Sequence, residues 1–236
     1  MVGKKDNDKE KEEIVLRICN LWEPLTDEHR RMLQQSVVLS RFKKNSIIYK
    51  EFEKPTHMMC LVSGKAKIYK EGIGGHQQIV RAIKPVDLFG YRAYIAGEDY
   101  KTSAMALEQS TVAMIPLGVV QKLMQESIPF NNFLIRHLSA MLGDSDSRTV
   151  NLTQKHIRGR LAEALIFLKD NYGVEEDGYT LSIYLSREDL ANLSNMTTSN
   201  AIRTLSTFAN EKLIAIDGRK IKIICDDELR KISNIG

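Results

Sequence analysis

The period of the hydrophobic pattern changes along the chain, and this change limits the fold more than any single motif. Residues 46–115 contain short apolar or β-branched stretches separated by turn signals such as Lys54-Pro55 and Ser63-Gly64. From Leu117 the apolar residues recur at spacings of three and four, and this helical pattern continues past residue 150. Many short strands at near-regular spacing indicate a β-roll or barrel. The six expected strands are residues 46–49, 58–62, 66–70, 77–83, 104–108 and 111–115.

The composition indicates an ordinary soluble protein of more than one domain. The chain has 236 residues, of which 43% are hydrophobic and 27% charged, and domains of roughly 100–150 residues are typical. The first thirteen residues are rich in Lys, Asp and Glu without the apolar stretch of a signal peptide, so we expect a disordered tail there. No apolar run approaches the roughly 18 residues of a membrane helix. Three widely spaced cysteines favour a reducing, cytoplasmic location.

A long helix is expected after the roll, and it is too long to be covered by the roll alone. Its apolar stripe would include Phe130, Leu134 and Leu138, followed by Met141 and Leu142. A second copy of the same helix is the natural partner for such a stripe. The alternative is a broken pair of core helices within a monomer. We therefore predict a sensory β-roll over residues 14–117 and a dimerisation helix over residues 118–154.

The last third of the chain, residues 155–236, has the pattern of a helix-turn-helix. A helix over 156–172 ends at Gly173, and a second begins at Ser186, which with Asp189 is close to a capping box. Asn195 suits the turn because it tolerates the left-handed conformation. Thr197 or Thr198 is expected to cap the next helix. The buried face of that helix would be formed by Ala201, Leu205 and Phe208.

A basic hairpin is expected to follow these helices and to complete a winged helix-turn-helix. Asp217-Gly218 between two alternating runs predicts a two-residue turn. Basic side chains at the tip suit backbone phosphates, and polar side chains on the second helix suit base edges in a major groove. The alternative is a small helical domain that binds protein. The residues expected to contact DNA are Arg187, Thr197, Thr198, Ser199, Asn200, Arg203, Arg219 and Lys220.

Net charge does not support DNA binding in this segment. Residues 155–231 contain twelve Lys or Arg and twelve Asp or Glu, whereas DNA-binding domains commonly carry a basic excess. The prediction therefore depends on the motif and on the local placement of charge.

Four motifs in order resemble the CRP/FNR family of bacterial transcription regulators. They are Leu-Val-Ser-Gly-Lys-Ala-Lys-Ile at 61–68, Asp-Leu-Phe-Gly at 87–90, Ile-Arg-Gly-Arg-Leu-Ala at 157–162, and the helix-turn-helix with its wing. The resemblance covers residues 14–233. It implies an α+β chain with a cyclic-nucleotide-binding-like β-roll, a long dimerisation helix and a C-terminal winged helix-turn-helix. It also implies a homodimer on a palindromic site, an effector near the dimerisation helix, and RNA polymerase as a partner.

The residues that hold cyclic AMP in the family are replaced in this chain. Where such members have a Glu after Phe-Gly and an Arg-Ser pair further on, this sequence has Tyr91 and Lys101-Thr102. A lysine does not reproduce the bidentate grip of an arginine on phosphate, so we do not expect cyclic AMP. Asp146 would also disfavour a bare anion. The expected effector pocket comprises Gly90, Tyr91, Arg92, Lys101, Thr102, Ser145 and Asp146.

The recognition helix also departs from the best-known family pattern. Members that read the common half-site have a Glu where Ser199 stands, with an Arg four positions later, which is retained as Arg203. We expect Arg203 to contact bases or phosphates in a different half-site.

Other family cofactors receive less support. An iron–sulfur cluster needs four cysteines, and this chain has three. Haem stays open because an axial ligand is available in His57, His76, His137 or Cys60. A constitutive regulator without a ligand is a further alternative, in which Arg81, Arg92 and Lys101 are solvated surface charges.

An enzyme of the cupin type is the competing class of function. It needs His and Glu ligands on adjacent strands, and the five histidines do not have that spacing. We find no catalytic constellation in the sequence.

Overall fold

The computed structural model describes residues 2–20, 22, 25–72 and 77–235, and it divides into two compact units. The first unit comprises residues 1–70 and 81–142, and the second comprises residues 71–80 and 143–236. Among the described residues, no helix is both long enough and apolar enough to cross a membrane.

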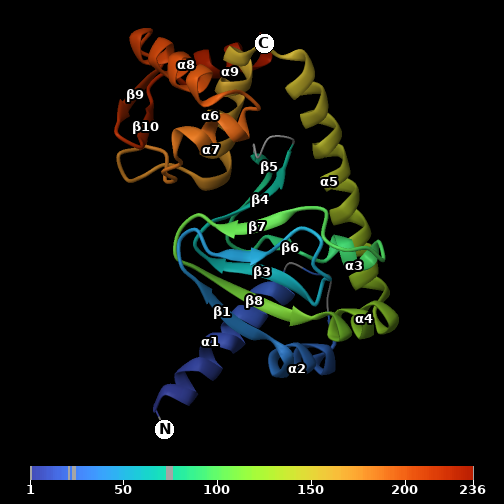
Figure 1. The fold of residues 1–236 in the computed structure, drawn as a ribbon. Coiled ribbons are helices and arrows are strands. Elements are labelled where there is room, and N and C mark those ends of the chain that lie inside the picture. The colour runs from blue at the N-terminus through green and yellow to red at the C-terminus, as the bar shows by residue number, and fades with distance from the viewer. Residues whose placement is uncertain (1, 21, 23–24, 73–76, 236) are drawn as a thin grey trace. The chain divides into compact units, whose positions relative to one another are not determined.

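A β-roll of two four-stranded sheets is built from the first half of the chain (Figure 1). One sheet has the order β1-β8-β3-β6 and the other the order β2-β7-β4-β5. The roll and its six expected strands are confirmed, while β1 and the two-residue β6 were not expected. The bounds are β1 Val38–Phe42, β2 Ile47–Tyr49, β3 His57–Ser63, β4 Ala66–Glu71, β5 Gln77–Ile83, β6 Leu88–Phe89, β7 Ser103–Ala106 and β8 Ser110–Pro116.

Gly64 joins β3 to β4 at a position that requires glycine. Its φ is +86°, as expected for this hairpin. A Cβ atom there would lie 2.3 Å from the Ser110 side-chain oxygen and 2.6 Å from the Gln109 carbonyl oxygen. Close backbone packing and the positive φ therefore both exclude a larger residue.

Helices α1 Val2–Cys19, α2 Asp27–Ser36 and α4 Leu117–Glu126 accompany the roll. Residues 2–13, which we expected to form part of a disordered tail, lie within α1 in the structure. From Ile14 onward α1 contributes buried apolar side chains to a core that also contains Trp22 and Phe130. The Trp22 and Phe130 ring centroids are 4.8 Å apart.

The long helix of the sequence prediction is divided in the structure at Ser127, between α4 and α5 Ile128–Gln154. α5 continues without a break through the polar residues 143–147, where a broken pair of helices was the alternative. The expectation that a second copy of the helix covers this apolar stripe was wrong in part. Phe130 and Leu134 are buried in the core of the first unit, and Leu138 packs against that core. Of the expected stripe Leu142 is exposed, and the other large exposed apolar residues of α5 are Ile128, Ile135 and Val150.

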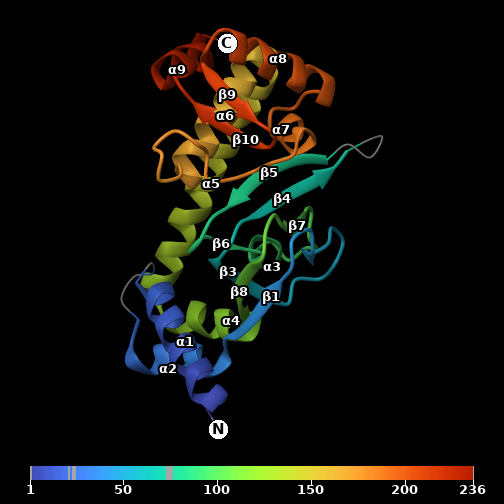
Figure 2. The ribbon, with the colours of Figure 1, turned by 90° about the vertical axis from the view of Figure 1, so that its left-hand side faces the viewer.

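The C-terminal segment forms the helical bundle and wing that the sequence predicted (Figure 2). α6 contacts α7, α8 and α9, and α8 contacts the first strand of the wing. The final helix α9 was not expected. The bounds are α6 Ile157–Tyr172, α7 Arg187–Leu193, α8 Thr198–Asn210, β9 Ile214–Asp217, β10 Lys220–Ile223 and α9 Asp226–Ile235.

The turn of the wing lies one residue later than the sequence suggested. Asp217 pairs with Lys220 in the β9–β10 ladder, so the two loop residues are Gly218 and Arg219, and the expected Asp217-Gly218 turn was wrong by one position. Gly218 has a φ of +55°. Glycine at the first loop position is typical of a type II′ turn.

Candidate nucleic-acid interface

Both helices of the helix-turn-helix begin at the side-chain caps that the sequence predicted. The Ser186 hydroxyl accepts a hydrogen bond from the Asp189 backbone N–H at 3.0 Å and donates to the Asp189 carboxylate at 2.8 Å. The Thr197 hydroxyl accepts from the Asn200 N–H at 3.3 Å. Asn195 has a φ of 50° in the turn. These local bonds fix where α8 starts and therefore which of its residues face outward.

α8 has one buried face and one open face. Ala201, Leu205 and Phe208 are buried, as predicted, and the Arg158 guanidinium lies 4.9 Å from the centre of the Phe208 ring. Among the expected DNA contacts on this helix, Thr198, Ser199 and Arg203 are exposed, Asn200 is half-buried, and the cap Thr197 is exposed. The bundle thus anchors α8 through its apolar face and leaves polar donors and acceptors open to solvent.

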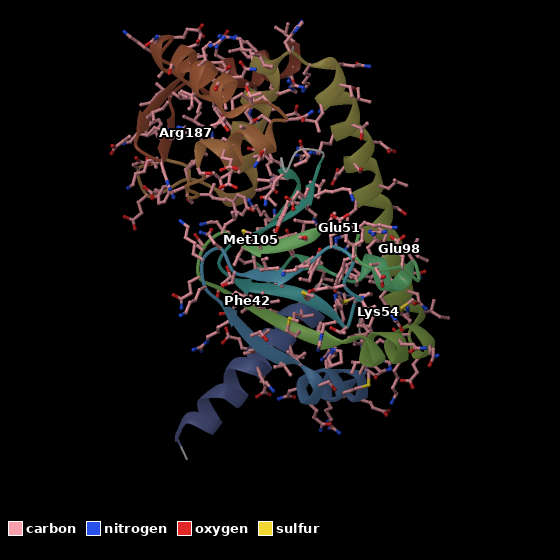
Figure 3. The ribbon with its side chains drawn as sticks, viewed as in Figure 1. Phe42, Glu51, Lys54, Glu98, Met105 and Arg187 are labelled. Carbon is pink, nitrogen blue, oxygen red and sulfur yellow. The ribbon has the colours of Figure 1, made fainter. Side chains whose placement is uncertain are left out.

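The wing is tied to the first helix of the motif by Arg187. Its guanidinium group donates to the Gly218 carbonyl oxygen at 2.6 Å, and Figure 3 labels Arg187 in this unit. Arg219 and Lys220, at the tip, are exposed. The structure therefore brings the expected DNA contacts together on α7, α8 and the wing, and it gives Arg187 a contact that holds the wing turn.

Much of the positive charge in this unit has an acidic partner within the unit. Lys222 pairs with Asp177 at 3.1 Å and Lys220 with Glu175 at 3.8 Å. Hydrogen bonds from the Thr180 side chain and backbone, and then from the Tyr179 backbone, lower the pKa of Asp177 below its ordinary value. Arg230 bonds Asp170 at 2.7 Å. These pairs account locally for the balanced charge that the sequence showed.

The residues expected to form an effector pocket occupy two kinds of environment. Tyr91 is buried, and its hydroxyl lies 3.1 Å from His137 Nδ1 on α5. Burial raises the pKa of Tyr91 to about 12, so the phenol stays neutral at physiological pH. Gly90, beside it, has a φ of +79°. Ser145 and Asp146 are exposed on α5.

The two cations of the expected pocket share one carboxylate. Arg92, on the short helix α3 Arg92–Ile95, lies 2.7 Å from Glu98, and Lys101 lies 3.6 Å from the same residue. Glu98 is labelled in Figure 3. The hydrogen bond from Arg92 lowers the pKa of Glu98 below its ordinary value, and Lys101 adds to the effect. Thr102 hydrogen-bonds the Tyr49 side chain. An anion would have to compete with Glu98 for these cations.

His137, Met141 and Arg81 lie around Tyr91, a grouping that was not expected from the sequence. The Arg81 guanidinium donates to the Met141 sulfur at 3.4 Å, and the Tyr91 hydroxyl lies 4.0 Å from that sulfur. Burial lowers the pKa of His137, and the Arg81 charge lowers it further. Their separations in sequence, 46 residues from Tyr91 to His137 and 60 from Arg81 to Met141, leave no local signal for these contacts.

The candidate haem ligands have other partners in the structure. His57 Nδ1 lies 2.8 Å from the Thr56 hydroxyl. Cys60 is buried, and burial raises its pKa to about 12, which opposes the thiolate that binds metal. His76 lies outside the described residues. Within the part of the chain that the structure describes, no group of three or more His, Cys, Asp or Glu is placed to hold a metal ion. Burial therefore argues against Cys60 as an axial haem ligand.

Two family models match the chain over the regions that form the roll and the winged helix-turn-helix. A cyclic nucleotide-binding domain matches residues 39–127, and a Crp-like helix-turn-helix domain matches residues 159–232. The chain belongs to the CRP/FNR family of transcription regulators.

Similar proteins support this membership. The fumarate and nitrate reduction regulatory protein of Vibrio cholerae is 24% identical over 92% of this chain and 88% of its own length. The CRP-like cAMP-activated global transcriptional regulator of Mycobacterium tuberculosis is 21% identical over 79% of this chain and 84% of its own. The structure of FixK2 from Bradyrhizobium japonicum has a TM-score of 0.76 at 20% identity, covering 83% of this chain and 96% of that one. This member of the CRP/FNR family is a DNA-binding transcription regulator and not an enzyme.

Proposed function

We propose that this CRP/FNR regulator acts as a homodimer that binds a palindromic DNA site, controlled by an effector other than cyclic AMP. The observation that carries the proposal is the open polar face of α8, where Thr198, Ser199 and Arg203 are exposed, in the same unit as the exposed basic wing tip. An α-helix fits the major groove, where polar side chains reach base edges. Arg219 and Lys220 would then contact phosphates and set the register of α8.

The proposed dimer uses the exposed stripe of α5. Ile128, Ile135 and Leu142 are 75%, 62% and 64% exposed and lie seven residues apart. A seven-residue apolar repeat is the pattern by which two helices pack along a common seam. A two-fold dimer presents two copies of α8 related by symmetry, which is why a palindromic site is expected.

The proposed effector site is the region around Tyr91 and around Glu98, the carboxylate that pairs with Arg92 and Lys101. It comprises Gly90, Tyr91, Arg92, Lys101 and Thr102 of the first unit. Glu98 partly neutralises the two cations that an anion would need, which argues against a cyclic phosphate. Because Tyr91 contacts His137 on α5, a ligand that displaced this contact would act on the proposed dimerisation helix. RNA polymerase is the partner proposed from the family.

Selection of binding sites from a random DNA pool, followed by titration of the selected duplex, tests the DNA-binding proposal. We expect Arg203→Ala to weaken binding about 5- to 150-fold, since a base contact by arginine contributes about 1–3 kcal/mol. Lys231→Ala, at a residue whose side chain is 67% exposed on α9, is the control and should bind as the wild type does. Equal binding by Arg203→Ala and wild type at every salt concentration would overturn the assignment of Arg203.

Absorbance and mass spectrometry of the protein purified anaerobically without added ligand test the effector proposal. A co-purified small molecule whose binding is lost in Tyr91→Phe would support the proposed site. A haem absorbance band would support the haem alternative and make His57, His76 and His137 the ligands to test by substitution. A colourless protein that carries no ligand and still binds its selected DNA tightly would support the ligand-independent alternative. The pairing of Arg92 and Lys101 with Glu98 favours that alternative.

A further inference from the structure

One exposed residue of α8 has a different chemistry from the rest. Ile202 is 47% exposed, whereas every other exposed residue of α8 is polar. The buried face of the helix is already formed by Ala201, Thr204, Leu205 and Phe208. Ile202 lies outside this buried face, so about half of its apolar side chain is open to solvent.

The neighbours of Ile202 are the residues proposed to read DNA. It follows Thr198 by four residues and Ser199 by three, so their side chains are adjacent on the helix surface, and Arg203 comes next in the chain. On the following turn, the Ser206 hydroxyl donates to the Ile202 carbonyl oxygen at 3.0 Å. That bond uses the Ser206 hydroxyl hydrogen on the helix backbone, so Ile202 and Arg203 are the exposed side chains between Ser199 and Ser206.

The major groove presents one apolar group, the C5-methyl of thymine. We propose that Ile202 recognises a thymine in each half-site through contact with this methyl group. The inference rests on the proposed insertion of α8 into the major groove and adds the identity of a base. Ser199 and Arg203 would supply hydrogen bonds to neighbouring base pairs, and Ile202 would exclude cytosine, which has a polar amino group and no methyl.

The test removes only the methyl group. In the duplex selected by the full-length wild-type protein, each thymine is replaced in turn by deoxyuridine, which keeps its hydrogen-bonding edges, and Kd is measured by fluorescence anisotropy. At one position in each half-site we expect about a fourfold weaker affinity, the effect of losing one buried methyl-sized group. In Ile202→Ala, thymine and deoxyuridine at that position should bind equally well.

Two further variants separate this role from a general effect on folding. Ile202→Val retains most of the apolar side chain and should still distinguish thymine from deoxyuridine. Ile235→Ala changes an isoleucine that is 87% exposed at the end of α9 and should leave the discrimination unchanged. Neither Ile202 variant should alter the salt dependence of binding, because no phosphate contact is removed.

The outcomes distinguish this inference from the proposed function. Selection of no DNA sequence would refute the proposed function and the inference with it. A selected site with no deoxyuridine-sensitive position, or with a sensitivity that persists in Ile202→Ala, would refute the role of Ile202 alone. In that case α8 still reads DNA and Ile202 has another partner.

Discussion

The region around α8 and the region around Tyr91 are arranged in opposite ways. On α8 the residues of interest are exposed, and short-range caps at Ser186 and Thr197 hold the helix in place. Around Tyr91 the phenol is buried against His137, and Arg92 is paired with Glu98. The first region exposes its polar groups to solvent, whereas in the second the polar groups already have partners within the protein.

This difference suggests a division of roles. A preformed surface binds without a large ordering cost, which favours affinity and specificity. A site whose groups are paired with one another must exchange those contacts when a ligand enters. Such an exchange can shift the conformation of the elements that carry the paired groups. The following predictions test whether the two regions differ in this way.

The largest expected effect comes from the anchor of α8. Phe208→Ala should lower the free energy of unfolding of the second unit by about 3–5 kcal/mol, because a fully buried ring is removed. Urea unfolding followed by circular dichroism measures it, and Phe52→Ala, at a 77% exposed position, is the control. Trp22, the only tryptophan, lies in the core of the first unit. The midpoint of unfolding followed by Trp22 fluorescence should therefore not move. An equal shift of that midpoint would contradict the view that the two units have separate cores.

A smaller effect is expected on the exposed stripe of α5. Ile135→Glu places a charge in the proposed dimer seam and should raise the dimer dissociation constant at least tenfold, or by about 1.4 kcal/mol. Analytical ultracentrifugation over a range of concentrations measures this constant. Ile135→Leu keeps the seam apolar and should dimerise as the wild type does. Unchanged dimerisation of Ile135→Glu would show that the partner of this stripe is not a second α5.

The smallest expected effect concerns the proton of His137. Because burial and Arg81 lower its pKa in the folded state, the unfolded chain binds the proton more tightly. The stability that His137 contributes is therefore present when the pH is above its pKa in the unfolded chain, about 6.5. It is lost as the pH falls toward the lower pKa of the folded protein. His137→Gln should flatten the pH dependence of urea unfolding in that window, followed by Trp22 fluorescence. A profile identical to that of wild type would show that His137 does not titrate differently in the two states.

The features that could be predicted from the sequence are those that depend on residues close together in the chain. The caps at Ser186 and Thr197 and the left-handed Asn195 were predictable because each signal lies within four residues of its effect. The wing turn was displaced by one position because the register of β9 and β10 depends on their pairing, which no single turn motif determines.

The features that the sequence did not reveal depend on contacts between distant segments. The pairing of Tyr91 with His137 joins residues 46 positions apart. The apolar residues of α5 follow the helical period on both faces, so the pattern alone did not separate Phe130, which is buried in the core, from Ile135, which is exposed. Only the packing of the roll distinguishes the two.

The internal pairing of basic residues in the second unit affects how the protein would be distributed along a chromosome. Lys220, Lys222 and Arg230 have acidic partners, and contact between lysines or arginines and phosphates supplies most of the affinity for arbitrary DNA. Cations that stay paired with these carboxylates add little to that affinity, so we expect the protein to leave non-target DNA more readily than a regulator whose basic residues are all unpaired. A larger fraction of its molecules is then free to occupy the target site, and occupancy depends more on the bases that α8 reads than on the amount of DNA in the cell.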